Sequence, residues 1–204
     1  MVDSTEGNRV SGGAVLRPRV TDAITDAAFA ELAETGYART SMDAVARRAG
    51  VGKAALYRRW RSKQAMLAEL IRDKVADALP PTPDTGALRT DLRDLFATFR
   101  AQLTHPLITR IGAGLLAEAE HDATLAEVLQ TGVAEPRRAA ARAILCAAID
   151  RGELPSGVEL ELGTDLLIAP LAFRALVLKR PIEDEYLDAL TRAIEAALKG
   201  LAQR

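Results

Sequence analysis

Apolar residues recur every three or four positions along most of the chain, the spacing of an α-helix that buries one face. In residues 18–35, for example, Ile24, Ala28 and Leu32 share one side of the helix. No stretch shows a sustained alternation of apolar and polar residues, so no β-sheet is expected. The pattern therefore predicts an all-α protein with about nine helices.

Prolines and glycines mark the expected ends and bends of these helices. The prolines in residues 80–83 end a predicted helix of residues 62–79, because proline lacks an amide hydrogen and clashes with a continuing helix. Gly132 and Pro136 predict a break or kink. Pro170 predicts another kink, in a later helix.

Two short predicted helices, residues 41–49 and 53–60, are joined by a tight turn at Gly50. Thr40 or Ser41 can cap the first helix, because a side-chain hydroxyl accepts a hydrogen bond from a first-turn amide. Glycine adopts the left-handed conformation that such a turn requires at little cost. Two helices joined in this way form a helix-turn-helix, whose second helix enters the major groove of DNA.

The charge distribution supports a nucleic-acid partner. Between Gly36 and Lys63 there are eight basic side chains and one acidic side chain, Asp43, so the local net charge is 8 − 1 = +7, whereas the whole chain carries −1. Cations that neutralise phosphates release condensed counterions, which favours binding to DNA. A run of charges is often only a solvated face. Here it coincides with the helix-turn-helix pattern, which favours double-stranded DNA as the partner.

The second helix of this pair is the predicted recognition helix. Arg58 is the expected base contact, since a guanidinium can bind O6 and N7 of guanine together. The other groove-facing positions offer a cation, methyl groups and close backbone approach: Gly52, Lys53, Ala54 and Ala55. Trp60 is expected to fill the core beneath the following helix.

Several short motifs at fixed spacing resemble the N-terminal signature of the TetR family: Gly36-Tyr37, Thr40-Ser41-Met42, Ala46-Arg47-Arg48-Ala49-Gly50-Val51, Leu56-Tyr57 and Ser62-Lys63. The resemblance runs from about Val20 to Leu70. It implies a dimeric, ligand-responsive repressor, in which Tyr57, Lys63 and either Thr40 or Ser41 would hold phosphates. The full predicted DNA-binding set is Thr40, Ser41, Arg48, Gly52, Lys53, Ala54, Ala55, Tyr57, Arg58, Arg59 and Lys63.

The chain is expected to divide into three parts. Residues 1–16 are polar and predicted to be a disordered arm. Arg9, Arg17 and Arg19 either let this arm touch the minor groove or are simply solvated. Residues 17–63 form the predicted DNA-binding domain. Residues 64–204 form a larger helical domain for ligand binding and dimerisation, and the helix of residues 62–79 links the two.

The last two predicted helices, within residues 159–179 and 183–201, carry more apolar surface than one protomer needs. This surplus predicts a homodimer packed as a four-helix bundle, as the family resemblance also implies. The expected interface residues are Leu166, Phe173, Leu187, Leu190, Ile194 and Leu198.

A small effector is expected to bind among the C-terminal helices and press on the linking helix. The candidate lining residues are Phe96, Phe99, Arg100, Leu103, Ile108, Ile111, Leu115, Cys146, Ile149 and Phe173. Each is individually more typical of a plain core position. Arg100 either orients an acidic ligand group beside the phenylalanines or makes a surface salt bridge.

The sequence contains no pattern typical of enzyme chemistry. It has no glycine-rich phosphate loop, no metal-spaced Cys/His cluster and no nucleophile elbow, so no cofactor and no metal are expected. His105 and His121 are expected at helix ends or in loops, and the single cysteine, Cys146, as a buried apolar residue. No apolar run reaches transmembrane length, which favours a cytoplasmic protein.

These observations predict a homodimeric repressor that a small, fairly apolar ligand releases from a palindromic operator. An activator or an effector-independent regulator fits the same pattern. A protein of a different class, an α-helical carrier or sensor whose head does not bind DNA, is a further alternative. A helical enzyme would need convergent polar groups, which the sequence does not supply.

Overall fold

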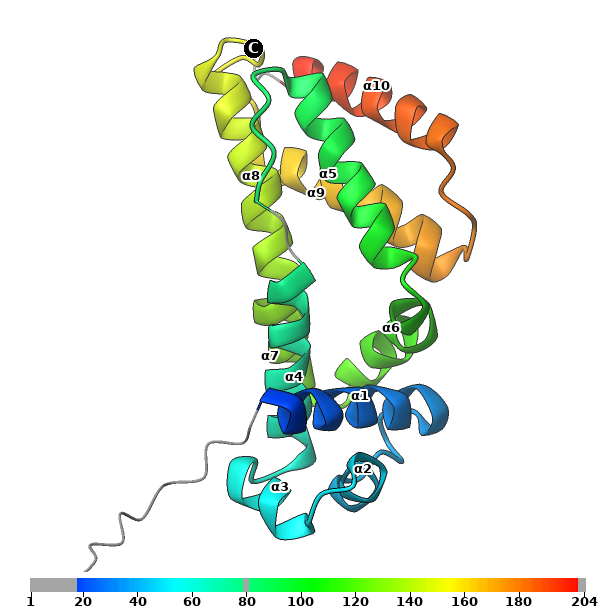
Figure 1. Cartoon of the computed structure of the whole chain (residues 1–204). Coiled ribbons are helices and arrows are strands. Elements are labelled where there is room, and N and C mark those ends of the chain that lie inside the picture. The colour runs from blue at the N-terminus through cyan, green and yellow to red at the C-terminus, as the bar shows by residue number, and fades with distance from the viewer. Residues whose placement is uncertain (1–17, 79–80, 202–204) are drawn as a thin grey trace, which may run out of the picture.

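The computed structural model describes residues 18–78 and 81–201, and every regular element in these ranges is helical (Figure 1). The predicted arm of residues 1–16 lies outside the described residues. The α-helices are α1 (Pro18–Thr35), α2 (Met42–Ala49), α3 (Lys53–Arg59), α4 (Lys63–Ala78), α5 (Leu88–Leu103), α6 (Pro106–Ala119), α7 (Ala123–Leu129), α8 (Glu135–Asp150), α9 (Leu160–Ala172) and α10 (Asp184–Gly200). Two π-helical turns, η1 (Gln130–Ala134) and η2 (Phe173–Val177), follow α7 and α9.

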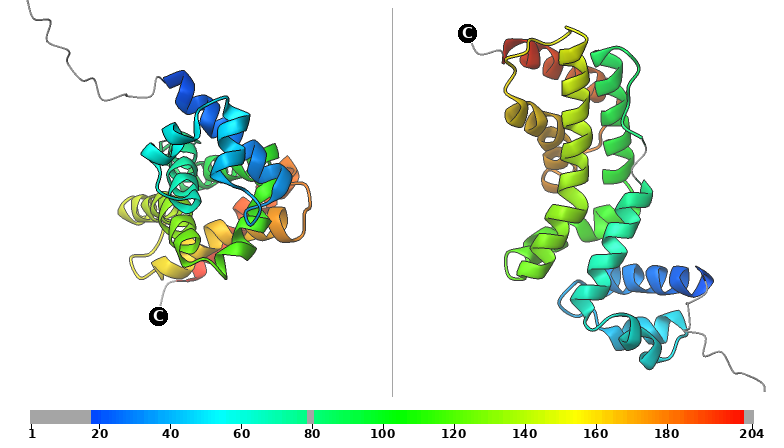
Figure 2. Two further views of the ribbon diagram at one scale, coloured as in Figure 1. Left: turned by 90° about the horizontal axis from the view of Figure 1, so that it is seen from below. Right: turned by 90° about the vertical axis from the view of Figure 1, so that its left-hand side faces the viewer.

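The prediction of an all-α protein with about nine helices is confirmed. Since α7 continues through η1 into α8 without a break, the ten α-helical segments of the described ranges make nine separate helices. In Figure 1, α1, α2 and α3 lie at one end of the molecule, and α4 rises from them toward the other helices. The two further views in Figure 2 show α9 and α10 together on one side of α5 and α8.

Side-chain caps set the starts of several helices, and the cap of α2 is one of the two that the sequence predicted. The Ser41 side chain accepts a hydrogen bond from the Ala44 amide at 3.2 Å and so caps α2. Ser62 accepts from the Ala65 amide at 3.1 Å at the start of α4, and Asp122 accepts from the Leu125 amide at 3.0 Å at the start of α7. Each of these caps satisfies an amide that has no partner inside its helix.

The buried apolar side chains of the described residues form two cores. The first contains residues of α1, α2, α3 and α4, together with Ile111 and Leu115 of α6 and Leu125 and Val128 of α7. The second is built from α5, α8, α9 and α10 and includes Phe96, which is fully buried. Helices α1, α2 and α3, which the sequence predicts to form the DNA-binding end of the molecule, therefore share their core with α6 and α7.

A π-helical turn replaces the break that Gly132 and Pro136 predicted. In η1 the helix is locally widened but continues, and π turns of this kind are often found at functional positions. Gly132 is buried there against α4, and a Cβ atom at this position would lie 2.5 Å from Cγ of Arg72. The absence of a side chain at residue 132 thus lets α4 pack closely on η1. Pro170 lies inside α9, which continues to Ala172 and then passes into η2.

We expect Gly132→Ala to lower the free energy of unfolding by about 1–2 kcal/mol, because the added methyl group overlaps the stem of Arg72. Urea denaturation monitored by circular dichroism measures this change. Gly114→Ala in α6 is the matched control, since nothing lies within 4 Å of a Cβ there and alanine favours the helix. Equal effects of the two substitutions would contradict the close packing of α4 on η1.

Candidate nucleic-acid interface

The turn between α2 and α3 has the geometry that its sequence predicted. Gly50 has a φ of 67° and a ψ of 27°, in the left-handed region that favours glycine. Its amide donates to the carbonyls of Ala46 and Arg47, and the Val51 amide donates to the Ala46 carbonyl at 3.0 Å. Val45 and Ala46 are buried where α2 packs within the first core. This packing fixes the angle at which α3 leaves the turn.

The outer face of α3 is open to solvent. Leu56 is fully buried and anchors the helix, whereas Ala54 and Arg58 are exposed and Tyr57 is 51% exposed. The Arg58 guanidinium makes no hydrogen bond or ion pair with another residue in the part of the chain that the structure describes. Ala55 is half-buried. The face thus presents a free cation, a phenol and a methyl group side by side.

Other cations of the predicted set are already paired. Lys53 forms an exposed ion pair with Asp43. The Arg48 guanidinium binds Glu34 with both of its terminal nitrogens, at 2.7 Å for Nη1, and lies 3.2 Å from Glu31. This hydrogen bonding lowers the pKa of the Glu34 carboxyl. Arg48 therefore braces α2 against α1.

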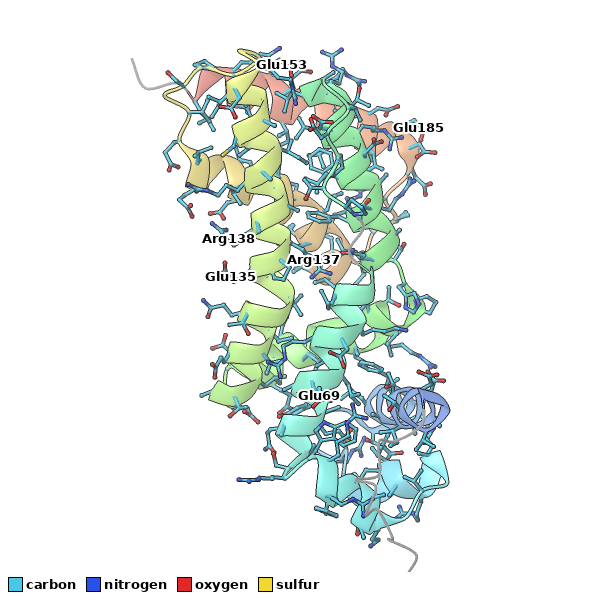
Figure 3. The ribbon with its side chains drawn as sticks, turned by 60° about the vertical axis from the view of Figure 1, so that its left-hand side comes forward. Glu69, Glu135, Arg137, Arg138, Glu153 and Glu185 are labelled. Atoms are coloured by element: carbon cyan, nitrogen blue, oxygen red, sulfur yellow. The ribbon has the colours of Figure 1, made fainter. Side chains whose placement is uncertain are left out.

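Arg59 also points back into the protein. Its Nη2 donates to Glu69 of α4 at 2.8 Å and its Nη1 donates to Thr21 of α1 at 3.0 Å. Its guanidinium carbon lies 4.4 Å from the ring centroid of Trp60. Trp60 is 2% exposed, as expected, and its indole donates to Glu69 at 2.9 Å. Figure 3 labels Glu69 on α4 next to the DNA-binding end.

The predicted phosphate-binding residues before α2 and at the start of α4 hold the segment between α1 and α2. Thr40 is 3% exposed, and its hydroxyl donates to the Gly36 carbonyl at 2.8 Å, so this side chain is not part of the surface. Lys63 donates to the Tyr37 carbonyl at 2.8 Å and lies 4.4 Å from the centroid of the Tyr37 ring. Ser41, in contrast, is exposed.

A hydrogen bond that the sequence did not reveal joins the DNA-binding end to α7. The Tyr37 hydroxyl donates to Oδ2 of Asp122 at 2.7 Å, across 85 positions of sequence. Burial, and then the bond to Asp122, raises the pKa of the Tyr37 hydroxyl. The bond from Tyr37, followed by the Leu125 amide, lowers the pKa of Asp122. No local sequence signal links residues so far apart.

Three arginines of the basic segment were not in the predicted set. Arg39 donates to the Thr35 carbonyl at 2.9 Å. Arg47 and Arg61 are both exposed and have no hydrogen bond or ion pair with another described residue through their side chains. Both arginines contribute to the net charge of +7 that the sequence shows for this segment. The sequence could not show that neither of them pairs with a carboxylate.

The predicted effector-lining residues are divided between the two cores. Phe96 and Phe99 belong to the second core, whereas Ile111 and Leu115 belong to the first. The remaining candidates are scattered: Leu103 borders a small cavity of about 240 Å³, Ile108 and Cys146 are half-buried, Ile149 packs against the second core and Phe173 is exposed. Periodicity had identified inward faces without showing which core each face enters.

Two arginines of α5 and α8, Arg100 and Arg137, are bound to other groups of the protein. Arg100 donates to Asp184 of α10 at 2.7 Å, which is the salt-bridge alternative. Arg137, which the sequence analysis did not single out, points toward α5 in Figure 3 and donates to the Val133 carbonyl at 2.8 Å and to Gln102 at 2.9 Å. Burial lowers the pKa of Arg137.

Half of the predicted dimer-interface residues lie inside the protomer. Leu187 and Leu198 are fully buried and Ile194 is 5% exposed, all in the second core. The apolar stripe of α10 therefore reflects packing within its own chain, chiefly against α5. Leu166 and Leu190 are half-buried, and Phe173 is 54% exposed.

Comparison with known families matches almost the whole described chain. The family described as bacterial regulatory proteins, tetR family, matches residues 24–70. The tetracyclin repressor-like C-terminal domain matches residues 82–194. The chain belongs to the TetR family. It is a DNA-binding transcriptional regulator with the family's helix-turn-helix, and it is not an enzyme.

The similarity to individual TetR-family relatives extends over most of the length of both proteins. The chain is 32% identical to the HTH-type transcriptional regulator YdeS of Bacillus subtilis over 182 residues, 88% of each protein. It is 32% identical over 168 residues to the DNA-binding transcriptional repressor TetR of Mycobacteroides abscessus, covering 82% of this chain and 87% of the relative. The crystal structure of the TetR-family regulator SCO0332 superimposes with a TM-score of 0.67 at 30% identity, covering 87% of this chain and 97% of the other.

Two kinds of feature are absent from the described ranges. Within residues 18–78 and 81–201, no helix combines the length and apolar character needed to cross a bilayer. The same ranges contain no group of three or more His, Cys, Asp or Glu side chains arranged to hold a metal ion.

We expect Tyr37→Phe to lower the free energy of unfolding by about 1 kcal/mol at pH 7, because it removes the hydrogen bond to Asp122 from a buried ring. The bond depresses the pKa of Asp122 in the folded state, so its contribution is present above the unfolded pKa of about 4 and is lost at lower pH. The difference between variant and wild type should therefore shrink as the pH falls below about 4.

Tyr186→Phe is the control for this measurement, because the Tyr186 hydroxyl has no hydrogen bond with another described residue. Its free energy of unfolding should stay within about 0.5 kcal/mol of wild type at every pH. A Tyr37→Phe difference that is independent of pH would show that Asp122 does not depend on this bond.

Proposed function

We propose that this TetR-family chain is a homodimeric repressor that leaves a palindromic operator when a small, fairly apolar molecule binds it. The observation that carries this proposal is the outer face of α3, where Arg58 is exposed and free of any described carboxylate. An unpaired cation beside an exposed tyrosine suits a polyanionic partner. The printed name of the Mycobacteroides abscessus relative, a transcriptional repressor, supports repression.

In this proposal the residues of the predicted set have two roles. Arg58 reads guanine, Ala54 and Ala55 contact thymine methyl groups, and Tyr57 and Ser41 contact phosphates. Gly52 lets the backbone approach the groove, with Lys53 beside it. Four other residues position α2 and α3 rather than bind DNA, because their polar groups are already bound to other groups of the protein: Thr40, Arg48, Arg59 and Lys63.

A homodimer is supported by the exposed apolar residues of α9 and η2. Six large apolar side chains are exposed in the described chain, and four of them, Leu162, Phe173, Val177 and Leu178, lie in or directly after these two elements. Leu162 and Phe173 share one side of the helix with the half-buried Leu166, since they are spaced by four and seven residues. An apolar stripe of this kind is typical of an interface between subunits.

The neighbouring helix α10 supplies a suitable surface for a second copy. Its exposed positions include small residues at the spacing of one helix face, namely Ala189, Ala193, Ala196 and Gly200. Large side chains of α9 packing on small side chains of the partner's α10 would allow the helices to approach closely. Leu162 and Val177 therefore join Leu166, Phe173 and Leu190 in the proposed interface. Two-fold symmetry places the recognition helices on successive major grooves, about 34–36 Å apart.

The proposed release mechanism depends on α4. This helix belongs to the first core with the DNA-binding helices and packs on η1 of the C-terminal part. A ligand that prefers the conformation unable to bind DNA shifts the population toward it through α4. Because the DNA partner lies in the bacterial cytoplasm, we place the protein there.

Selection of bound sequences from random duplex DNA at two salt concentrations tests the first step. We expect a palindrome, and we expect Arg58→Ala to weaken binding to it by about 10- to 100-fold while leaving nonspecific binding nearly unchanged. Arg142→Ala on α8 is the matched control, with an exposed arginine far from α3 along the chain. Recovery of no common sequence, with weak binding that salt abolishes, would favour a carrier or sensor instead.

Phe173→Glu tests the interface by placing a charge in its proposed apolar stripe. We expect the dimer dissociation constant, measured by analytical ultracentrifugation, to rise by about 100-fold or more, because the carboxylates would be buried without partners. Leu116→Glu is the matched control, since Leu116 of α6 is 52% exposed and Phe173 is 54% exposed. A Phe173→Glu variant that dimerises as tightly as the control would refute this interface.

A further inference from the structure

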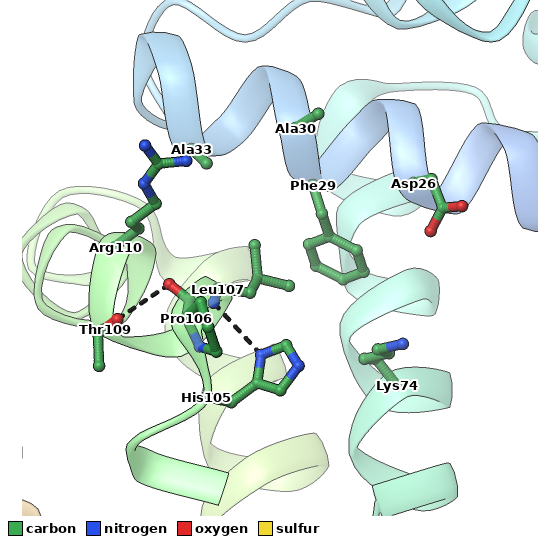
Figure 4. A pocket seen from close by; sticks show the side chains of 10 residues that line it. All are labelled: Asp26, Phe29, Ala30, Ala33, Lys74, His105, Pro106, Leu107, Thr109 and Arg110. Carbon is green, nitrogen blue, oxygen red and sulfur yellow. Dashed lines mark hydrogen bonds between the residues drawn. The ribbon is translucent and has the colours of Figure 1, made fainter.

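A cavity of about 480 Å³ lies where the DNA-binding end meets the C-terminal helices. It is bordered by α1, α4 and the beginning of α6 (Figure 4). Its volume is within the range of small-molecule binding sites in proteins. None of the residues predicted to line an effector site borders it, because that prediction was confined to the C-terminal helices.

The floor of the cavity is apolar. The Phe29 ring, which is 6% exposed, points from α1 toward the turn that begins α6 (Figure 4). Leu107 of that turn is half-buried, and Ala30 and Ala33 line the α1 side. This surface suits an aliphatic chain or an aromatic ring, whose transfer from water is favourable.

The rim of the cavity carries cations without partners. Lys74 of α4 and Arg110 of α6 make no hydrogen bond or ion pair with another described residue. Arg110 attracts the Glu34 carboxylate, but Glu34 is already held by Arg48. Asp26 is the single carboxylate among the lining residues, so two cations face one anion and the lining carries a net +1.

The beginning of α6 adds to this positive character. His105 accepts the Leu107 amide on Nδ1 at 3.3 Å, which leaves Nε2 free at the cavity. The helix that follows has 14 residues, and the N-terminus of a helix favours negative charge nearby. Three independent features, Lys74, Arg110 and the N-terminus of α6, therefore converge on one cavity with an apolar floor.

We propose that this cavity is the effector site and that it binds a small organic acid with an apolar body. The carboxylate accepts hydrogen bonds from Lys74 and from Nε2 of His105, which lie on the same side of the cavity, and the apolar body lies on Phe29 and Leu107 (Figure 4). The regulatory part of this proposal rests on the proposed function, namely release from DNA by a ligand. The binding part does not, because it follows from the cavity and its lining alone.

The position of the cavity explains how such an acid would act on DNA binding. Its walls belong to α1 of the DNA-binding end, to the linking helix α4 and to α6 of the C-terminal part. An acid held between Lys74 of α4 and His105 at the start of α6 fixes the distance between α4 and α6 while its body packs on Phe29 of α1. Any difference in this spacing between the conformations that do and do not bind DNA becomes a difference in ligand affinity.

The two histidines of the chain provide a direct test. Octanoate is the probe, octanamide is its neutral counterpart, and the side-chain ¹H–¹⁵N NMR signals of His105 and His121 in the full-length protein are the readout. His105 borders the cavity, and the exposed His121 lies outside it as an internal control. We expect octanoate to shift the His105 signals with a dissociation constant of about 1 mM or tighter, and to leave His121 unchanged.

Charge-removing variants show whether the rim recognises the carboxylate. Lys74→Gln should weaken octanoate binding about tenfold, since it removes one charge-assisted hydrogen bond. Arg110→Gln should weaken it less, because Arg110 contributes only its charge at the rim. Arg192→Gln, an exposed α10 arginine without a described partner, should leave it unchanged. Equal affinity for octanamide, equal shifts of both histidines, or no shift of His105 at about 10 mM octanoate would overturn the site.

Operator binding, measured by fluorescence anisotropy of labelled DNA, separates this proposal from the proposed function. Octanoate that shifts His105 and lowers operator affinity supports both. Binding at His105 without any effect on operator affinity overturns the effector role while leaving the site. Release of operator DNA by a different compound that does not shift His105 overturns this site and leaves the proposed function intact.

Discussion

The structure depends on one shared hydrophobic core, because the helices of the DNA-binding end cannot bury their apolar faces by themselves. A three-helix unit of this size encloses little surface. Its core is completed by α4, by Ile111 and Leu115 of α6, and by Leu125 and Val128 of α7. The head and part of the C-terminal region therefore fold around the same side chains. A movement of α6 or α7 would therefore change the packing of the helices that position α3, namely α1, α2 and α4.

Polar contacts reinforce this shared core at its edges. The Tyr37 hydroxyl reaches Asp122 at the start of α7, and Lys63 holds the Tyr37 carbonyl from the start of α4. On the opposite side of α4, Gly132 allows η1 to lie against Arg72. The linking helix is thus in contact with both ends of the molecule, and the cavity beside α1 lies where these contacts leave space.

Features set by neighbouring residues, such as helix caps and turns, could be predicted from the sequence. Contacts between residues far apart in the sequence could not. The cap at Ser41 and the turn at Gly50 follow from residue types within a few positions. The pairing of Arg48 with Glu34 and of Arg59 with Glu69 does not, because periodicity identifies a buried face but not its partner. For the same reason the stripe of Leu187 and Leu198 in α10 suggested a second subunit, although it packs within its own chain.

Trp60 is the only tryptophan in the sequence, and it lies at the point where α3 ends and α4 approaches. Glu69 binds both its indole and the neighbouring Arg59, whose guanidinium stacks on the ring. These contacts join the end of α3 to α4. They also surround the protein's single tryptophan, whose fluorescence therefore reports on this joint without any label.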